Sequence, residues 1–174
     1  MAKLKILDDT DPALHKKCRE VDKITPRILR LIDDMKETLT DVGGVGLAAP
    51  QVGVLRRIAI VESDDGRLYE LINPKIIAMS EKRQNEIEGC LSIPERWGIT
   101  DRPESVTVAA TDRNGNAYTV TGVGLTARAF CHEIDHLDGI VFTDHALRML
   151  TEEELAAMNE ENAKEKEDDK TERE

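Results

Sequence analysis

The chain has 174 residues, of which 34% are charged and only 3% aromatic, and its formal net charge is −11. This length suits one domain with a core of aliphatic side chains. The acidic balance argues against nucleic acid or an anionic membrane as a direct partner, because both attract basic surfaces. No stretch has the apolar pattern of a signal peptide or a membrane span, so we expect a cytoplasmic protein.

The first quarter of the chain predicts an irregular arm, a helix and a segment of small residues. Residues 1–24 indicate an arm with short extended pieces. Thr25 and Pro26 are typical of a helix start, and apolar residues then recur at helical spacing to about Asp41. Residues 44–51 (GVGLAAPQ) lack the Lys and Ser/Thr of a phosphate loop. They indicate either a tightly packed turn or a backbone that lies close to a ligand.

The middle of the chain predicts strands. The pairs Asp65-Gly66 and Asn114-Gly115 each lie between strand-like runs and indicate two hairpins. Asn73-Pro74 interrupts the pattern, so a separate short strand is expected after it. The expected strands cover residues 58–61, 68–72, 75–78, 106–111 and 117–121, with further strand-like residues on both sides of Cys90.

An H-E-x-x-H pattern begins at His132 in a stretch with helical periodicity that ends near Gly139. Residues four apart lie on one face of a helix, so His132 and His136 can present both imidazoles to one metal ion. Glu133 is offset by one position, where it can reach a water beside the ion without being a ligand. Two ordinary core or surface histidines are the alternative.

Two histidines require at least one further ligand for a stable site. His15 and His145 are candidates, as are the cysteines. Cys131 adjoins His132, so its side chain points about 100° away on the helix. Cys18 lies among polar residues and is interpreted as a surface thiol. Cys90 follows a glycine between strand-like residues, which favours it as a thiolate ligand, with a buried inert cysteine as the alternative.

The end of the chain indicates a short helix and a polar tail. Thr151 and Glu154 form a capping box that opens a helix to about Met158. Residues 159–174 carry almost no apolar side chain and are expected to be solvated helix or disorder. We therefore expect a catalytic domain over residues 1–150 and an acidic appendage over residues 151–174.

Three blocks, residues 44–51, 88–92 and 132–136, resemble those of peptide deformylases in their order and separation. Residues 11–14 and 122–125 add to the likeness, which reaches about Leu147. The resemblance implies an α+β fold with mixed or antiparallel strands wrapped around a central metal-binding helix. An N-terminal amphipathic helix and a C-terminal helix complete the expected fold.

The resemblance also implies roles for particular residues. Cys90, His132 and His136 would hold the metal, and Glu133 would transfer protons. The sequence departs from the family at Cys131, where many members carry glutamine.

The remaining implied roles concern the substrate. Gln51 and the backbone amide of Leu91 would receive the oxyanion, and Gly46 would pair its backbone with an extended peptide. The methionine pocket would be lined by Val45, Leu125 and Ala129. Arg128 occupies a place that is often apolar in the family.

The activity implied is hydrolysis of the N-formyl group from the N-terminal formylmethionine of newly made polypeptides, with release of formate. The ligand set accepts Fe(II), Zn(II), Ni(II) or Co(II), and the resemblance favours Fe(II) in the cell. Formylmethionyl nascent peptides are the expected partners, and any ribosome association is expected to be weak because the tail is acidic. A general H-E-x-x-H zinc peptidase and a non-catalytic metal-binding module are the alternatives.

Overall fold

The computed structural model describes residues 2–171. The α-helices in this range are α1 (Pro26–Val42), α2 (Leu125–Leu137) and α3 (Glu152–Thr171). Single turns of 3-10 helix are η1 (Pro12–His15), η2 (Ala49–Val52) and η3 (Phe142–Asp144). The strands are β1 (Gly46–Ala48), β2 (Ile58–Glu62), β3 (Leu68–Met79), β4 (Arg83–Cys90), β5 (Ile93–Pro103), β6 (Ser105–Thr111), β7 (Ala117–Val123) and β8 (Arg148–Met149).

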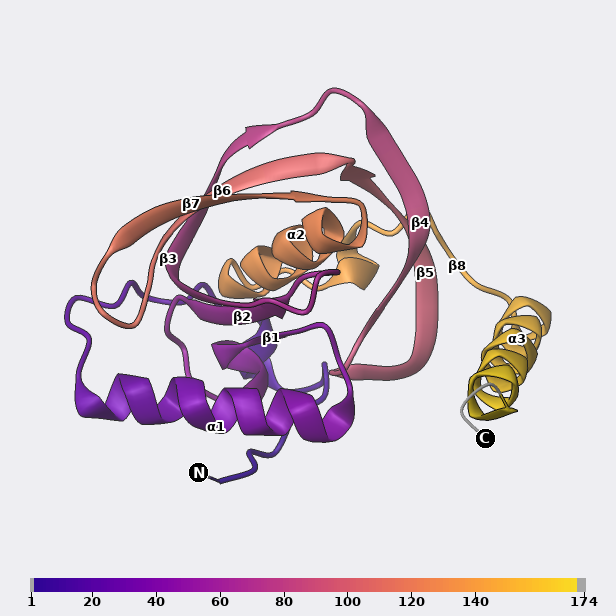
Figure 1. Cartoon of the computed structure of the whole chain (residues 1–174), viewed down its shortest axis with the longest axis horizontal. Helices are drawn as coiled ribbons and strands as arrows, with labels where there is room; N and C mark the ends of the chain where they lie inside the picture. The colour runs from indigo at the N-terminus through magenta and orange to yellow at the C-terminus, as the bar shows by residue number, and fades with distance from the viewer. Residues whose placement is uncertain (1, 172–174) are drawn as a thin grey trace.

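Within residues 2–171 the strands form a five-stranded sheet, in the order β1-β2-β3-β6-β7, and a three-stranded sheet, in the order β4-β5-β8. Every strand pairing in these two sheets is antiparallel. Helix α2 lies in the middle of the strands, and α1 runs along the other side of β1 and β2 (Figure 1). The predicted α+β fold with strands around a central helix is confirmed.

Strand β2 shows why the molecule needs a helix on each face of the larger sheet. Successive side chains of a strand point to opposite faces. Ala59 and Val61 accordingly pack into the apolar cluster around α2, whereas Ile58 and Ile60 pack into the cluster under α1. All four are fully buried, which is why this strand reads as a continuous apolar run.

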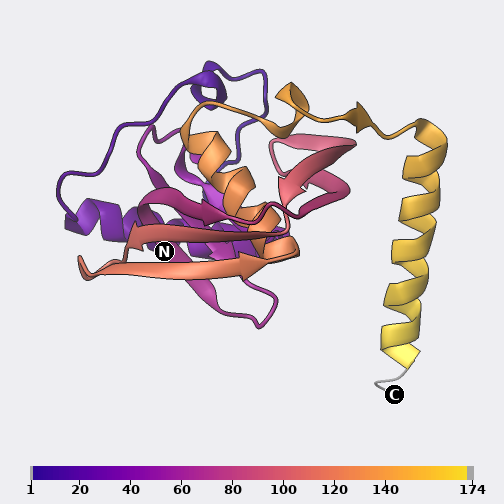
Figure 2. The ribbon, with the colours of Figure 1, turned by 90° about the horizontal axis from the view of Figure 1, so that it is seen from above.

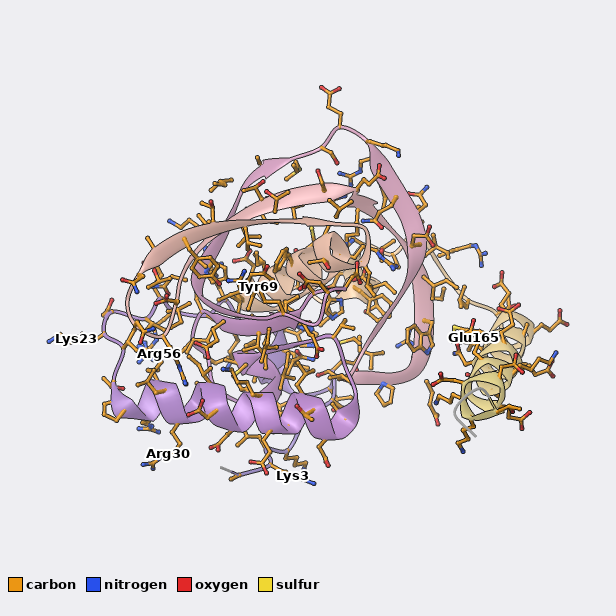
Figure 3. All side chains as sticks on the ribbon, viewed as in Figure 1. Lys3, Lys23, Arg30, Arg56, Tyr69 and Glu165 are labelled. Carbon is orange, nitrogen blue, oxygen red and sulfur yellow. The ribbon has the colours of Figure 1, made fainter. Side chains whose placement is uncertain are left out.

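Aromatic packing joins α2 to the larger sheet. Tyr69 of β3 meets Phe130 of α2 edge to face, with ring centroids 6.0 Å apart. Tyr69 lies beside α2 in the sheet-lined interior (Figure 3). Since edge-to-face pairs add to the gain from apolar burial, this contact helps to hold the face of α2 that points away from the metal group.

The local signals at the predicted turns and helix ends are largely confirmed. Thr25 caps α1, with its hydroxyl accepting a hydrogen bond from the amide of Ile28 at 3.3 Å. The helix ends at Val42, and Gly43 follows in the left-handed conformation. Both predicted hairpins are present, since β2 pairs with β3 and β6 pairs with β7.

The prediction of a separate strand at residues 75–78 is wrong, because β3 continues from Leu68 to Met79. Asn73-Pro74 lies inside the strand, where the pairing of β3 with β6 shifts in register between Ile72 and Lys75. Asn73 has a φ of 51°. Its side chain accepts from the amide of Val21 at 2.8 Å and donates to the carbonyl of the same residue at 2.9 Å. The N-terminal arm therefore binds the Asn73 side chain at this irregularity, while the Asn73 amide donates to the carbonyl of Arg57 at 2.8 Å.

Helix α3 begins as predicted but continues far beyond Met158, to Thr171. The capping box is present, with the amide of Thr151 donating to Glu154 at 2.8 Å and the amide of Glu154 donating to Thr151 at 3.2 Å. The helix stands away from the body, and Glu165 lies on this isolated helix (Figures 2 and 3). No helix within residues 2–171 is both long and apolar enough to cross a membrane.

The interpretation of Cys18 as a surface thiol is wrong. Its side chain is only 4% exposed and belongs to the apolar cluster around α2. The amide of Cys18 donates to the carbonyl of Leu137 at 2.8 Å, so the N-terminal arm lies against the end of α2. The polar neighbours Lys17 and Arg19 are exposed, since alternate residues of an extended arm point in opposite directions.

Candidate metal centre and active site

Helix α2 brings the two histidines of the H-E-x-x-H pattern together in the interior. The Nε2 atoms of His132 and His136 are 3.2 Å apart, and both side chains are buried. One turn of helix separates the two residues, so the backbone alone places both rings on the same face. The predicted helix and its histidine pair are therefore present as expected.

Cys90 reaches the histidines from the end of β4. The pairing of β4 with β5 shifts in register between Gly89 and Cys90, where the chain turns. The Cys90 Sγ lies 3.3 Å from the His136 Nε2 atom. The potential ligand atoms of Cys90, His132 and His136 all lie within 4.8 Å of one another. Of the candidates for a third ligand, Cys90 is the one that the structure brings to the histidines.

The other third-ligand candidates lie elsewhere. His15 contacts the carbonyl of Asp9 at 2.7 Å, and His145 contacts Asp135 at 3.2 Å. Cys131 packs into the apolar cluster around α2, and its side chain points away from the metal group, as its position next to His132 predicts. Burial raises the pKa values of both Cys18 and Cys131 to about 11, which suits inert thiols rather than ligands.

The donor set fits a divalent metal ion. Burial lowers the pKa of His132, but hydrogen bonds to Cys90 and Glu88 outweigh it and raise that pKa well above its ordinary value. Burial and the neighbouring His132 lower the pKa of His136. Of the two adjacent imidazoles, His132 therefore has the higher affinity for a proton and His136 the lower. A divalent cation bound here would supply positive charge at the same place, and one sulfur and two nitrogen ligands leave one position of a tetrahedral site open.

The buried carboxylate of Glu88 binds the ring nitrogen of His132 that is not directed at the metal group. Glu88 Oε1 lies 2.7 Å from His132 Nδ1, and the same carboxylate accepts from Arg102 at 2.7 and 3.1 Å and from Thr100 at 2.6 Å. Burial raises the pKa of Glu88, but the hydrogen bonds from His132 and Arg102 outweigh it and leave that pKa well below its usual range. Because an ionised carboxylate only accepts, Nδ1 must donate, and Nε2 is left to bind a metal.

Sequence reasoning did not identify Glu88 and Arg102 as parts of the site. Glu88 precedes Cys90 by two residues on one strand, so the alternation of β4 was a usable signal. Arg102 has no comparable local signal, because it reaches Glu88 only through the pairing of β4 with β5.

Glu133 lies beside the metal group and is fully buried. Its Oε2 atom has no hydrogen-bond partner among the described residues. Burial raises the pKa of Glu133 to about 7. A carboxyl group with a pKa near neutrality can both accept and release a proton at cellular pH.

The small-residue segment brings Gln51 to the same place. Gln51 is buried in η2, and its Oε1 accepts from the amide of Ala48 at 2.9 Å. This contact turns the Nε2 of Gln51 toward Ser92 Oγ at 3.2 Å and Cys90 Sγ at 3.6 Å. The amide group of Gln51 is thus held next to the metal group, with the N–H groups of Nε2 directed at Ser92 and Cys90.

A cavity of about 490 Å³ opens over the metal group. The expected substrate residues Val45, Gly46, Leu125 and Ala129 line it, together with Leu91 and Gln51. Sequence reasoning missed further lining residues from the smaller sheet, among them Ile87, Glu95 and Trp97. The cavity combines an apolar wall with Cys90, His132 and Glu133, which is the usual composition of a small-substrate site.

Arg128 also lines the cavity, at the position where the sequence departs from the apolar residue usual in the family. Its Nη1 donates to the carbonyl of Ile87 at 2.7 Å. The side chain therefore links α2 to β4 across the cavity wall, and its stem supplies apolar surface there.

These features together define a metal-dependent hydrolase, with a Cys-His-His group, a buried carboxyl beside it and a cavity above. A family model described as polypeptide deformylase matches residues 3–152. The chain belongs to the polypeptide deformylase family.

Curated relatives named peptide deformylase match nearly the whole chain. The protein from Finegoldia magna is 48% identical over 163 residues, covering 92% of this chain and 99% of its own. The protein from Acetivibrio thermocellus is 51% identical over 155 residues, covering 89% of this chain and 90% of its own.

Solved structures agree with the fold. The peptide deformylase from Thermotoga maritima matches with a TM-score of 0.81 and 33% identity, over 84% of this chain and 99% of that one. The peptide deformylase from Ehrlichia chaffeensis in complex with actinonin matches with a TM-score of 0.81 and 36% identity, over 95% and 98% of the two chains.

Proposed function

We propose that this chain hydrolyses the N-formyl group from the N-terminal formylmethionine of newly made polypeptides and releases formate. The observation that carries the proposal is the convergence of Cys90, His132 and His136 beside the buried, unpartnered Glu133 at the base of the cavity. Membership of the polypeptide deformylase family supports the same reaction.

We propose that Cys90, His132 and His136 hold one divalent metal ion, with Fe(II) as the ion in the cell. One thiolate and two imidazoles also accept Zn(II), Ni(II) and Co(II). A bound cation supplies a Lewis acid that activates water and polarises the formyl carbonyl. Glu88 keeps His132 in the tautomer that such binding needs.

Glu133 is the proposed proton carrier. Its carboxyl lines the cavity beside the metal group. Burial without a hydrogen-bond partner raises its affinity for a proton. Glu133 can accept the proton of the attacking water and then deliver it to the leaving amine. Proton transfer by one carboxyl in both directions is consistent with a pKa near neutrality.

Gln51 and the backbone amide of Leu91 are proposed to stabilise the oxyanion. Gln51 is held by Ala48 and Ser92, so its amide group does not have to be ordered during the reaction. Donors that are fixed in advance stabilise the charge that develops on the carbonyl oxygen. Leu91 follows Cys90 directly and lines the same cavity.

The cavity is proposed to bind an extended formylated peptide. Gly46 lies on β1, at the free edge of the larger sheet, where its backbone can pair with a peptide strand. Val45, Leu125 and Ala129 offer an apolar pocket, and an unbranched, flexible side chain such as methionine fits one. The close approach of Gly46 to Glu133 supports a narrow space beside the reacting carbonyl, which would admit a formyl hydrogen but not an acetyl methyl group.

Two alternatives predict different products. A general H-E-x-x-H zinc peptidase would cleave internal peptide bonds, but such enzymes usually add a His or Glu ligand, whereas this group contains Cys90. A non-catalytic metal-binding module would leave Glu133 and Gln51 without a role. The buried, unpartnered carboxyl of Glu133 favours the enzyme.

We further propose that the protein acts in the cytoplasm on nascent chains, without binding nucleic acid or a membrane directly. The net charge of −11 supports this proposal, since it opposes attraction to phosphate. Any ribosome association is proposed to be weak, because α3 begins with three glutamates.

The test compares kcat/KM for N-formyl-Met, N-acetyl-Met and N-formyl-Asp peptides with Fe(II) or Ni(II) protein prepared without oxygen. We expect formate release, and a preference for N-formyl-Met over each of the other two that reaches or exceeds ~10–200-fold. Equal rates on formyl and acetyl peptides would contradict the proposal. So would cleavage of an internal peptide bond.

A further inference from the structure

The chain that follows α2 contacts the metal-binding face of the molecule at two points. The ring of Phe142 stacks on that of His132, with centroids 6.3 Å apart and planes 26° apart. Three residues later, His145 Nε2 lies 3.2 Å from Asp135 Oδ2. Phe142 is buried in a small cluster against which Cys90 packs. Residues 142–145 therefore support the metal group from the side opposite the larger sheet.

A continuous series of hydrogen bonds links His145 to the metal group. Asp135 Oδ2, which meets His145, also accepts from Arg102 Nη1 at 2.6 Å. Arg102 Nη2 donates to Glu88 Oε1 at 2.7 Å. Glu88 Oε1 in turn lies 2.7 Å from His132 Nδ1. His145 is about one-third exposed and His132 is buried, so the series runs from the surface to the metal group.

We propose that His145 is a positioning residue for the metal centre and acts through Asp135 and Arg102. Glu88 and Asp135 both bind the guanidinium of Arg102. The position of one carboxylate therefore restricts how Arg102 can bind the other. The hydrogen bond from His145 keeps the carboxylate of Asp135 in place. Arg102 then remains bound to Glu88 through two nitrogens.

The consequence for the metal centre follows from the orientation of His132. Glu88 fixes this ring through Nδ1, and Phe142 limits its tilt. If Asp135 loses its hydrogen bond to His145, the carboxylate can rotate and take Arg102 with it. Glu88 and the ring of His132 are then less firmly positioned. Groups that orient a metal-bound histidine commonly contribute ~10–100-fold in affinity, and a more remote residue should contribute less.

The inference rests on the proposed metal centre, and the experiment separates the two. Zn(II) affinity of the apoprotein is measured by competition with a chromophoric chelator, and the visible spectrum of the Co(II) protein reports ligand geometry. We expect His145→Phe to weaken Zn(II) binding by about 3–10-fold and to shift the Co(II) bands. His145→Gln should restore affinity to within about twofold, because its amide nitrogen can replace Nε2 as the donor to Asp135.

The controls distinguish positioning from simple loop packing. His15→Phe removes another exposed histidine, whose ring contacts the Asp9 carbonyl rather than Asp135, and it should leave affinity and spectrum unchanged. In an Asp135→Ala background, which offers His145 no acceptor, His145→Phe should cause no further loss, since the two residues act in series. If His145→Phe does not fold, His145→Asn, whose side chain is too short to reach Asp135, takes its place.

Two results would overturn the inference while leaving the metal centre intact. One is a His145→Phe protein with unchanged Zn(II) affinity and Co(II) spectrum. The other is His145→Gln binding as weakly as His145→Phe. A wild-type protein that binds no Zn(II) or Co(II) would instead overturn the proposed metal centre, and this inference with it.

Discussion

Gly46 and Glu133 lie so close together that residue 46 has no room for a side chain. A Cβ atom on Gly46 would be 2.5 Å from Glu133 Oε1 and 2.9 Å from its Cγ. These two residues come from opposite sides of the cavity, one from the edge strand β1 and the other from α2. The small-residue segment therefore serves the site by letting a strand edge pass directly over the buried carboxyl.

We predict that Gly46→Ala displaces Glu133 and lowers kcat/KM on a formyl-Met peptide by about 10²-fold, because catalytic groups tolerate little misplacement. Metal content should not change, since the three atoms nearest to the added Cβ all belong to Glu133, which is not a proposed ligand. Gly115→Ala is the matched control, as it lies in a hairpin turn with open space around it and should cost stability only. A Gly46→Ala protein with wild-type kcat/KM would show that Glu133 need not hold its observed position.

Glu133→Gln should separate metal binding from chemistry. Gln keeps the shape of the side chain but cannot carry the proton, so kcat should fall by about 10²–10⁴-fold while the metal is retained. Metal analysis after dialysis and steady-state kinetics measure the two properties. Glu81→Gln, at an exposed position between β3 and β4, controls for the loss of one negative charge. Near-normal turnover by Glu133→Gln would mean that another group transfers the proton.

Cys90→Ser should weaken metal retention, because it removes the thiolate from the group that also contains His132 and His136. Cys18→Ser and Cys131→Ser should each retain one equivalent of metal after dialysis. Both of these cysteines are buried in the apolar cluster around α2, so their substitution should lower the melting temperature instead. A Cys90→Ser protein that keeps a full equivalent of metal would contradict the ligand assignment.

The three thiols should differ sharply in reactivity. Burial raises the pKa values of Cys18 and Cys131 to about 11, so at pH 8 they are almost fully protonated and inaccessible. A disulfide reagent should therefore label Cys90 first in the apoprotein, and the other two only after unfolding. Addition of Zn(II) should protect Cys90. Mass spectrometry of the labelled peptides measures the order, and early labelling of Cys18 would contradict its burial.

Removal of residues 159–174 should leave the melting temperature and the turnover of small peptides almost unchanged. Helix α3 has no buried residue among those described, so little apolar surface is lost with it. A longer deletion that begins at Arg148 provides the comparison, since it removes β8 and its pairing with Gly98 and Ile99 of β5. We expect a clear fall in melting temperature only for the longer deletion. This pair of truncations also tests the expected boundary near residue 150.

Several features could be predicted from the sequence because they depend on residues close together in the chain. The spacing of His132 and His136 needs only a helix to place both rings on one face. The caps at Thr25 and Thr151 and the two Gly-containing turns are equally local signals. The glycine and strand-like residues around Cys90 favoured it as a ligand, and the family resemblance added Gln51 and the lining residues, which no local pattern could have joined to α2. At Asn73, by contrast, local reasoning was wrong, since the bonds to Val21 join residues 52 positions apart.

The sequence by itself determined the metal-binding helix, the hairpins and the chemical types of group available to a metal. Only the tertiary structure decided how those groups are held. The partnership of Glu88 with Arg102 depends on strand pairing, and the close approach of Gly46 to Glu133 depends on the packing of β1 against α2. The burial of Cys18 depends on the arm lying against Leu137. These contacts join distant residues, and their geometry is set by the packing of the whole core rather than by any short run of residues.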